Sequence, residues 1–134
     1  MVQRFTRRAF LALLLLFALP ALAVQRVKLE IDFGDGIHKL FDRISWKEGM
    51  TVRDAMDAAQ ASGHGIKYEA RGSGETAFLT RIDDVANQGG RGQKKNWVYR
   101  VNGKLADKSF GVYKLKEGDS VVWKFEPPPS RKEK

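Results

Sequence analysis

Few side chains in this sequence are suited to catalysis or to metal binding. The chain has two histidines, His38 and His64, and no cysteine, and the histidines lack the close spacing of a helical metal-binding pair. Ser73 and Ser109 are the candidate nucleophiles, but neither lies in the Gly-x-Ser-x-Gly turn that exposes a catalytic serine. We therefore predict that the protein is not an enzyme and that it holds no cofactor and no metal.

A glycine-rich basic segment precedes the first of two late aromatic runs. Residues 89–95 read Gly-Gly-Arg-Gly-Gln-Lys-Lys, which lacks the Gly-x-x-x-x-Gly-Lys-Ser/Thr spacing of a phosphate-binding loop. Long polar loops in compact domains often carry binding residues, and neighbouring aromatic rings supply stacking area. The residues predicted to form a ligand-binding surface are Arg91, Lys95, Trp97, Tyr99, Asn102 and Lys104.

The two aromatic residues of that set have two interpretations. Trp97 and Tyr99 alternate along a predicted strand, so both lie on the face that also carries Val101. That face is either part of the hydrophobic core or, at the end beside the basic loop, the wall of a ligand site. The exposure of the two rings distinguishes the interpretations.

The N-terminus has the composition of an export signal. Three arginines precede an apolar run over residues 9–19, and residues 20–23 end in the small-x-small pattern that a signal peptidase recognises. The arginines are Arg4, Arg7 and Arg8. Residues 6–11 match most of the twin-arginine export pattern, whereas the leucine-rich run is typical of the general secretory route, and both routes remain open. Either route predicts a bacterial protein that is periplasmic or secreted.

The net charge of the whole chain is +8, and the three leader arginines account for part of it. In the remainder, acidic residues are interspersed with basic ones, whereas nucleic-acid binding requires a contiguous basic stripe. We therefore predict no nucleic-acid partner. We also predict that the chain has no membrane span once the leader is removed and that it is a monomer.

The first part of the mature chain has the pattern of a hairpin followed by a helix. Residues 27–33 alternate apolar and charged side chains, a Gly-Asp-Gly turn follows, and residues 37–46 are predicted to return with Leu40, Ile44 and Trp46 facing inward. Thr51 is then a predicted helix N-cap with Asp54 at the third helical position. The helix should bury one stripe and end at Ser62-Gly63; the stripe is Val52, Ala55, Met56 and Ala59.

The second part is rich in predicted strands. Residues 66–70 and 77–82 are predicted strands, and residues 86–96 form a long polar loop. Two aromatic strands follow, broken by Asn-Gly and Gly-Asp turns, and Pro127-Pro128-Pro129 ends the last one. We predict an α+β fold, a β-grasp mixed sheet with one packed helix. The predicted divisions are a signal peptide (1–23), a β-grasp domain (24–126) and a proline-rich charged tail (127–134).

Four motifs carry a resemblance to a known family. In chain order they are Thr51-Val52-x-Asp54-Ala55, Phe78-Leu79-Thr80-x-Ile82-Asp83, Asn96-Trp97-x-Tyr99-x-Val101-Asn102-Gly103-Lys104, and Tyr113-x-Leu115-x-x-Gly118-Asp119-x-Val121-x-Trp123. Over residues 27–125 the sequence resembles the transcobalamin C-terminal-domain-like family, which consists of uncharacterised exported bacterial β-grasp domains of the soluble-ligand-binding type. One departure is Asp84, which stands where members usually have glycine.

The resemblance implies a binding module without catalysis. Corrinoid binding enters only by analogy with animal transcobalamins, because no residue here independently indicates it. Our leading hypothesis is an exported module for an anionic or macrocyclic small ligand. The alternative is a protein-interaction module that binds an envelope protein through a sheet edge or the long loop.

The leader generates a prediction about processing. Because the small-x-small pattern ends at Ala23, the protein isolated from its own host should begin at Val24. N-terminal sequencing of the envelope fraction checks this, and finding Met1 there would contradict it.

Overall fold

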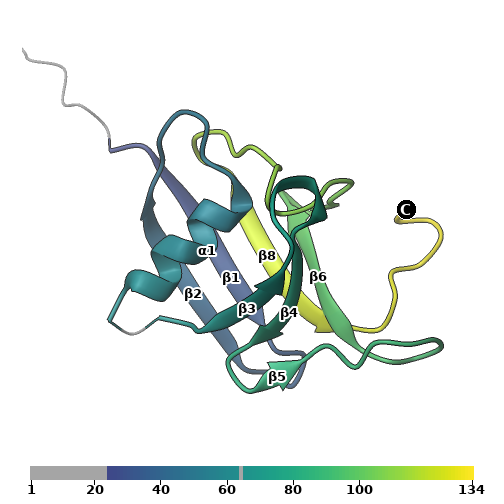
Figure 1. Ribbon diagram of the computed structural model, residues 1–134. Helices are drawn as coiled ribbons and strands as arrows, with labels where there is room; N and C mark the ends of the chain where they lie inside the picture. The colour runs from purple at the N-terminus through teal and green to yellow at the C-terminus, as the bar shows by residue number, and fades with distance from the viewer. Residues whose placement is uncertain (1–23, 64) are drawn as a thin grey trace, which may run out of the picture.

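The structure, a computed structural model, describes residues 24–63 and 65–134. The predicted signal peptide, with Ala23, and His64 lie outside the described residues. Figure 1 shows a twisted five-stranded sheet with one α-helix and a small three-stranded sheet on the same face. The elements are β1 (Arg26–Asp32), β2 (His38–Ser45), α1 (Val52–Ala61), β3 (Tyr68–Arg71), the 3₁₀ turn η1 (Gly74–Thr76), β4 (Phe78–Ile82), β5 (Val85–Ala86), β6 (Asn96–Val101), β7 (Lys104–Leu105) and β8 (Ser120–Glu126).

The large sheet has the order β2-β1-β8-β6-β7. Strand β1 pairs antiparallel with β2 and parallel with β8, which places Leu29 beside Val121 and Ile31 beside Trp123. A parallel pair needs a long crossover, and α1 and the small sheet form it. This mixed sheet with a helix packed across it is the β-grasp arrangement, so the fold prediction is confirmed.

The inward set predicted for β2 needs one correction. Leu40 is 65% exposed, because it pairs with Glu30 on the solvent face of the sheet. Phe41, opposite Leu29, packs against the core in its place. A register shift between Val27 and Leu29 then returns Ile44 to the inner face, as predicted. A bulge of this kind changes which side chains face inward without changing the hydrophobic content of the strand.

Helix α1 follows the predicted pattern closely. The Thr51 side chain accepts a hydrogen bond from the Asp54 N–H, and the Asp54 carboxylate accepts one from the Thr51 N–H, which completes a capping box. The predicted apolar stripe is buried against the large sheet.

Trp46, the third residue predicted to face inward from residues 37–46, is half-buried and donates its indole N–H to Leu115 O at 2.8 Å.

Aromatic rings fill the space between the two layers. Trp97 contacts Phe33 edge-on at 5.4 Å between ring centroids, and Tyr99 lies 4.7 Å from Trp123. Phe110 meets Trp123 edge-on at 5.5 Å. Rings in such geometries add to the free energy gained by burying their surface.

Asp83 lies in the turn next to Asp84, the residue at which the sequence differs from the family pattern. Its φ of +52° is a left-handed conformation, tolerated better by aspartate than by most residues. One carboxylate oxygen accepts from the Lys67 N–H at 2.9 Å and the other from Lys39 Nζ at 2.7 Å. The turn therefore ties the small sheet to β2.

The C-terminal segment returns to the large sheet. Arg100 donates from Nε to Glu133 Oε1 at 2.5 Å and lies 2.7 Å from Glu126 Oε1 through Nη1. The hydrogen bond to Glu133 raises the pKa of Arg100 and lowers the pKa of Glu133.

In the described part of the chain, no helix has the length and hydrophobicity needed to cross a bilayer.

The burial of β1 generates a stability prediction. Ile31 has no exposed surface, so Ile31→Ala should lower the free energy of unfolding by about 2–5 kcal/mol through lost burial and a residual cavity. Urea denaturation followed by circular dichroism measures the loss. Leu40→Ala is the matched control on the adjacent strand, with an expected change within about 0.5 kcal/mol because Leu40 is exposed. A loss below about 1 kcal/mol for Ile31→Ala would contradict the assigned inner face.

Candidate functional site

The two predicted aromatic ligand contacts lie in the core. Trp97 and Tyr99 are 6% and 8% exposed. The Trp97 indole N–H donates to Val85 O at 2.9 Å, and the Tyr99 hydroxyl donates to Lys108 O at 2.5 Å. Burial raises the pKa of Tyr99, so its hydroxyl stays protonated and keeps this bond. The core interpretation of both rings is therefore the one that the structure shows.

The four other predicted contacts lie at opposite ends of β6. Asn102, with φ of +52°, accepts from the Ser120 N–H at 2.9 Å and donates to Asp119 Oδ1 at 2.8 Å, so its side chain holds a turn. Lys104 is exposed beside it, whereas Arg91 and Lys95 precede the other end of the strand. A strand of this length separates its ends by roughly 17 Å, so the six predicted residues do not form one site.

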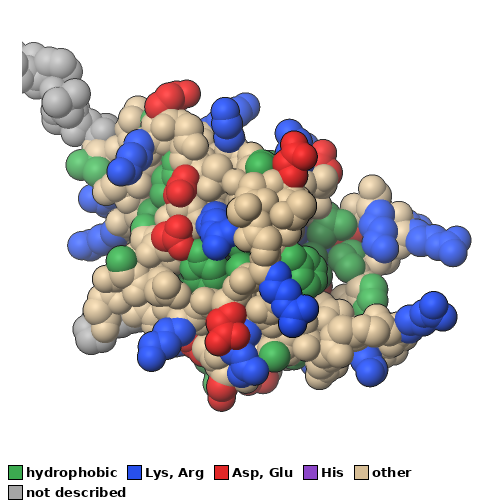
Figure 2. Space-filling view, viewed as in Figure 1, with side chains coloured by type: hydrophobic (Ala, Val, Ile, Leu, Met, Phe, Trp, Pro, Cys, Tyr) green, Lys and Arg blue, Asp and Glu red, His purple; other side chains and the backbone are tan. Residues whose placement is uncertain are grey.

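Asn87 was not singled out from the sequence, yet it joins the small sheet to β6. Its side chain donates to Leu79 O at 2.7 Å and accepts from the Trp97 N–H at 2.8 Å. The loop that follows closes on itself, because the Gln88 N–H donates to Lys95 O at 3.0 Å and the Lys95 N–H donates to the Gln88 side-chain oxygen at 2.8 Å. Figure 2 shows Lys and Arg side chains gathered where this loop and the C-terminal segment project from the body.

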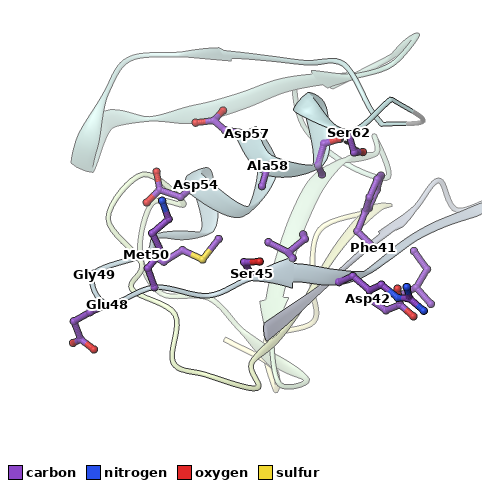
Figure 3. A pocket seen from close by; sticks show the side chains of 15 residues that line it. Phe41, Asp42, Ser45, Glu48, Gly49, Met50, Asp54, Asp57, Ala58 and Ser62 are labelled. Carbon is purple, nitrogen blue, oxygen red and sulfur yellow. Dashed lines mark hydrogen bonds between the residues drawn. The ribbon is translucent and has the colours of Figure 1, made fainter. Parts of the chain in front are cut away.

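A groove of about 740 Å³ lies between β2 and α1. Its apolar lining residues include Leu40, Phe41 and Ile44. In Figure 3, Met50 and Ala58 lie between the helix and the strand. We call this hollow the β2–α1 groove. Its volume lies within the range of about 300–1,000 Å³ that ligand pockets occupy.

The helical rim of the β2–α1 groove is acidic. Asp54 and Asp57 lie one helical turn apart along α1 (Figure 3). Asp54 is bound to the Thr51 N–H and hydroxyl, and Asp57 accepts the hydroxyl of Tyr68. Burial, followed by this contact with Asp57, raises the pKa of Tyr68 to about 12. Among the described residues neither carboxylate forms an ion pair with a basic side chain.

Strand β2 also has an unpaired edge. It is the first strand in the sheet order, with β1 on one side and no strand on the other among the described residues. Leu40 and Ile37, at 65% and 59%, are among the most exposed apolar side chains. An edge strand of this kind presents backbone N–H and C=O groups to a partner.

A smaller hollow of about 200 Å³ lies between β4 and β6. We call it the β4–β6 hollow. Trp97 and Tyr99 line it from β6, Phe78 from β4 and Trp123 from β8. A cavity therefore does adjoin Trp97, although the ring itself is buried.

No group of three or more histidine, aspartate or glutamate side chains within residues 24–63 and 65–134 is placed to hold a metal ion. His38 lies on the solvent face of the sheet, with Nδ1 2.8 Å from Glu30 Oε1 and Nε2 4.0 Å from Asp32 Oδ1. This is an exposed surface pairing.

A solved structure with a similar fold comes from Ruminococcus gnavus, where the protein is described as a "putative metal binding protein". The TM-score is 0.60 at 10% sequence identity, and the match covers 78% of this chain and 99% of that chain. At this identity the similarity shows a shared fold.

No curated protein sequence matches the chain. A family model described as a domain of unknown function, DUF4430, matches residues 49–127. This region runs from the loop before α1 to the end of β8, so it contains the lining of the β4–β6 hollow and the helical side of the β2–α1 groove, whereas β2 lies outside it. The protein belongs to the DUF4430 family.

Proposed function

We propose that the protein is an exported, non-enzymatic binding module that docks an extended segment of a partner protein in the β2–α1 groove. The observation that carries this proposal is the unpaired edge of β2 beside an apolar groove. Of the two classes of ligand considered from the sequence, the geometry favours the protein partner, since the residues expected to hold a small anionic ligand are dispersed.

The backbone of β2 is oriented for strand addition. The Phe33 N–H donates to Ile37 O at 3.1 Å, and alternate residues of an antiparallel pair point toward and away from the partner strand. The N–H and C=O groups of His38 and Leu40 therefore point away from β1. An added segment would pair with these groups, as in other complexes formed at a sheet edge.

The side chains of the groove define the chemistry of that segment. Apolar side chains on one face of an extended segment would contact Phe41 and Ile44, which line the groove. Asp54 and Asp57 on the helical rim favour lysine or arginine at neighbouring positions. The proposed partner thus presents alternating apolar and basic residues.

We do not propose metal binding for this chain, although a protein of similar fold is described as a putative metal binder. No group of three or more metal-ligating side chains is present in the described residues, and His38 has only the carboxylates of Glu30 and Asp32 beside it. The resemblance to transcobalamin C-terminal domains supports the class of binding module. A macrocycle is too large to enter the β4–β6 hollow of about 200 Å³, and no observation indicates a corrinoid.

Export is also part of the proposal, and the leader composition supports it. The partner is accordingly expected in the bacterial envelope or outside the cell. Replacing Arg7 and Arg8 by lysine should block export by the twin-arginine route, because that route requires both arginines. The same replacement should leave export by the general secretory route unchanged.

A peptide titration tests the docking proposal. The probe is a capped heptapeptide of alternating lysine and valine, and the glutamate–valine peptide is its matched control. Amide resonances of β2, recorded by NMR with ¹⁵N-labelled protein, should shift on adding the lysine peptide and much less on adding the glutamate peptide. Asp57→Asn keeps an acceptor for Tyr68 and removes one charge, so it should weaken lysine-peptide binding about two- to fivefold.

Two substitutions at one position separate backbone pairing from side-chain contact. Leu40→Pro removes an outward N–H at a strand edge, where proline is tolerated, and should weaken binding by about tenfold or more. Leu40→Ala keeps that N–H and should retain most of the affinity. Equal binding by both variants, or shifts confined to elements other than β2 and α1, would overturn the proposal.

A further inference from the structure

Two exposed segments carry the net charge of the chain that follows the predicted leader. Residues 24–134 contain 21 of the 24 basic residues, since three arginines lie in the leader, and all 16 acidic ones, which gives a net charge of +5. The loop of residues 87–95 and the tail of residues 127–134 together contain six basic residues and one acidic residue, so they account for all of this charge. The six basic residues, which we call the basic end, are Arg91, Lys94, Lys95, Arg131, Lys132 and Lys134.

The fold brings the loop and the tail together. The loop enters β6 at Asn96, which lies opposite Glu126, the residue from which the tail leaves β8. The tail then returns toward β6, because Arg100 Nε donates to Glu133 Oε1 at 2.5 Å. Both segments are therefore held beside the same strand, and in Figure 2 Lys and Arg side chains project on this side of the molecule.

The one acidic residue of the tail is already compensated. Glu133 pairs with Arg100, whose Nη1 lies 2.7 Å from Glu126 Oε1. The hydrogen bond from Arg100 lowers the pKa of Glu133, so this carboxylate stays ionised and attached.

The basic end, in contrast, has no acidic partner. Five of its six side chains are exposed and that of Lys95 is half-buried. Among the described residues none of the six forms an ion pair. The loop and the tail therefore present uncompensated positive charge to the solvent.

The chemistry of the two segments indicates the partner. Clusters of about four to eight lysines and arginines bind anionic bilayers by electrostatic attraction. Neither segment contains a phenylalanine, tyrosine or tryptophan on which a nucleic-acid base could stack. None of the six basic residues lines the β2–α1 groove or the β4–β6 hollow. A broad anionic surface therefore fits the basic end better than a nucleic acid or a small enclosed anion.

We propose that the basic end binds the anionic headgroups of a phospholipid membrane, and that the loop and the tail contact the membrane as one surface. Apart from three prolines, the two segments have no hydrophobic side chain to insert, so the contact is electrostatic and the protein stays at the bilayer surface. Strands β1 and β8 lie between β6 and β2. The membrane contact is thus separate from the β2–α1 groove and does not depend on the function proposed for that groove.

Sedimentation with lipid vesicles tests the proposal. The protein used is residues 24–134, which contain every element of the described fold and exclude the apolar leader. It should bind vesicles of phosphatidylglycerol and phosphatidylcholine in equal parts, and it should not bind vesicles of phosphatidylcholine alone. The Debye length falls from about 30 Å at 0.01 M salt to about 3 Å at 1 M, so raising the salt concentration over this range should release the protein.

Two double variants test whether both segments take part. Arg91→Gln with Lys94→Gln neutralises part of the loop, and Arg131→Gln with Lys132→Gln neutralises part of the tail. Each pair removes two positive charges from the proposed contact and should weaken vesicle binding about tenfold or more. All four side chains are exposed, so the substitutions should leave the stability of the fold unchanged within about 0.5 kcal/mol.

A third double variant is the matched control. Lys114 and Lys116 are exposed and precede β8, whereas the tail follows it, so they lie toward the opposite end of that strand. Lys114→Gln with Lys116→Gln removes the same two charges from the whole protein. Vesicle binding by this variant should stay within about twofold of the wild type, because a charge beyond the screening distance from the membrane adds little.

Four results would overturn the proposal. Equal binding to the charged and the uncharged vesicles would exclude headgroup charge as the cause. An equal loss in the control and the loop variant would show that binding follows net charge alone, and full binding by either the loop or the tail variant would show that the two segments do not act together. Tighter binding to single-stranded DNA than to vesicles, at equal phosphate concentration, would assign the surface to nucleic acid. Failure of peptide docking at the β2–α1 groove would change none of these measurements.

Discussion

The parallel pairing of β1 with β8 is the interaction on which the rest of the structure depends. It joins the first and last strands of the described chain at the centre of the large sheet. The intervening chain has to cross one face to make this pairing, and it places α1 and the small sheet there side by side (Figure 1). Those two elements then enclose the apolar side chains of β1, β6 and β8. Strand β1 pairs with β2 on one side and with β8 on the other, and its apolar and charged side chains alternate. A shift of register by one residue would turn its apolar side chains to the solvent face.

Both hollows arise at the margins of this cover. Helix α1 reaches the outermost strand but leaves its edge open, which forms the β2–α1 groove. The small sheet approaches β6 without a continuous backbone ladder, and the side chain of Asn87 bridges the two instead. The β4–β6 hollow lies at that interrupted junction. Openings of this kind follow from covering a five-stranded sheet with two short elements.

Local sequence patterns predicted the framework of the fold and little of its binding surfaces. The alternation of β1, the capping box at Thr51 and the turn at Asn102 are short-range signals, and the structure contains all three. The exposure of Leu40 was missed because a bulge shifts the register of β2, and no residue type marks that bulge.

The predicted ligand residues were close in sequence but not in space, since β6 separates one end of the set from the other. The acidic pair Asp54 and Asp57 was visible at helical spacing, yet the groove beside it depends on how α1 packs against β2, which local patterns do not determine. The charges of the basic end can be counted in the sequence, but the nearness of its two segments depends on the pairing of β6 with β8.

The position of β8 also has a kinetic meaning. Because the centre of the large sheet is completed by β8, the last strand of the described residues, the core cannot close until β8 has been synthesised. Until then β1 lacks its inner neighbour, and its apolar face remains accessible to chaperones. A chain built in this way has an interval, between the synthesis of β1 and its pairing with β8, in which the core is still open.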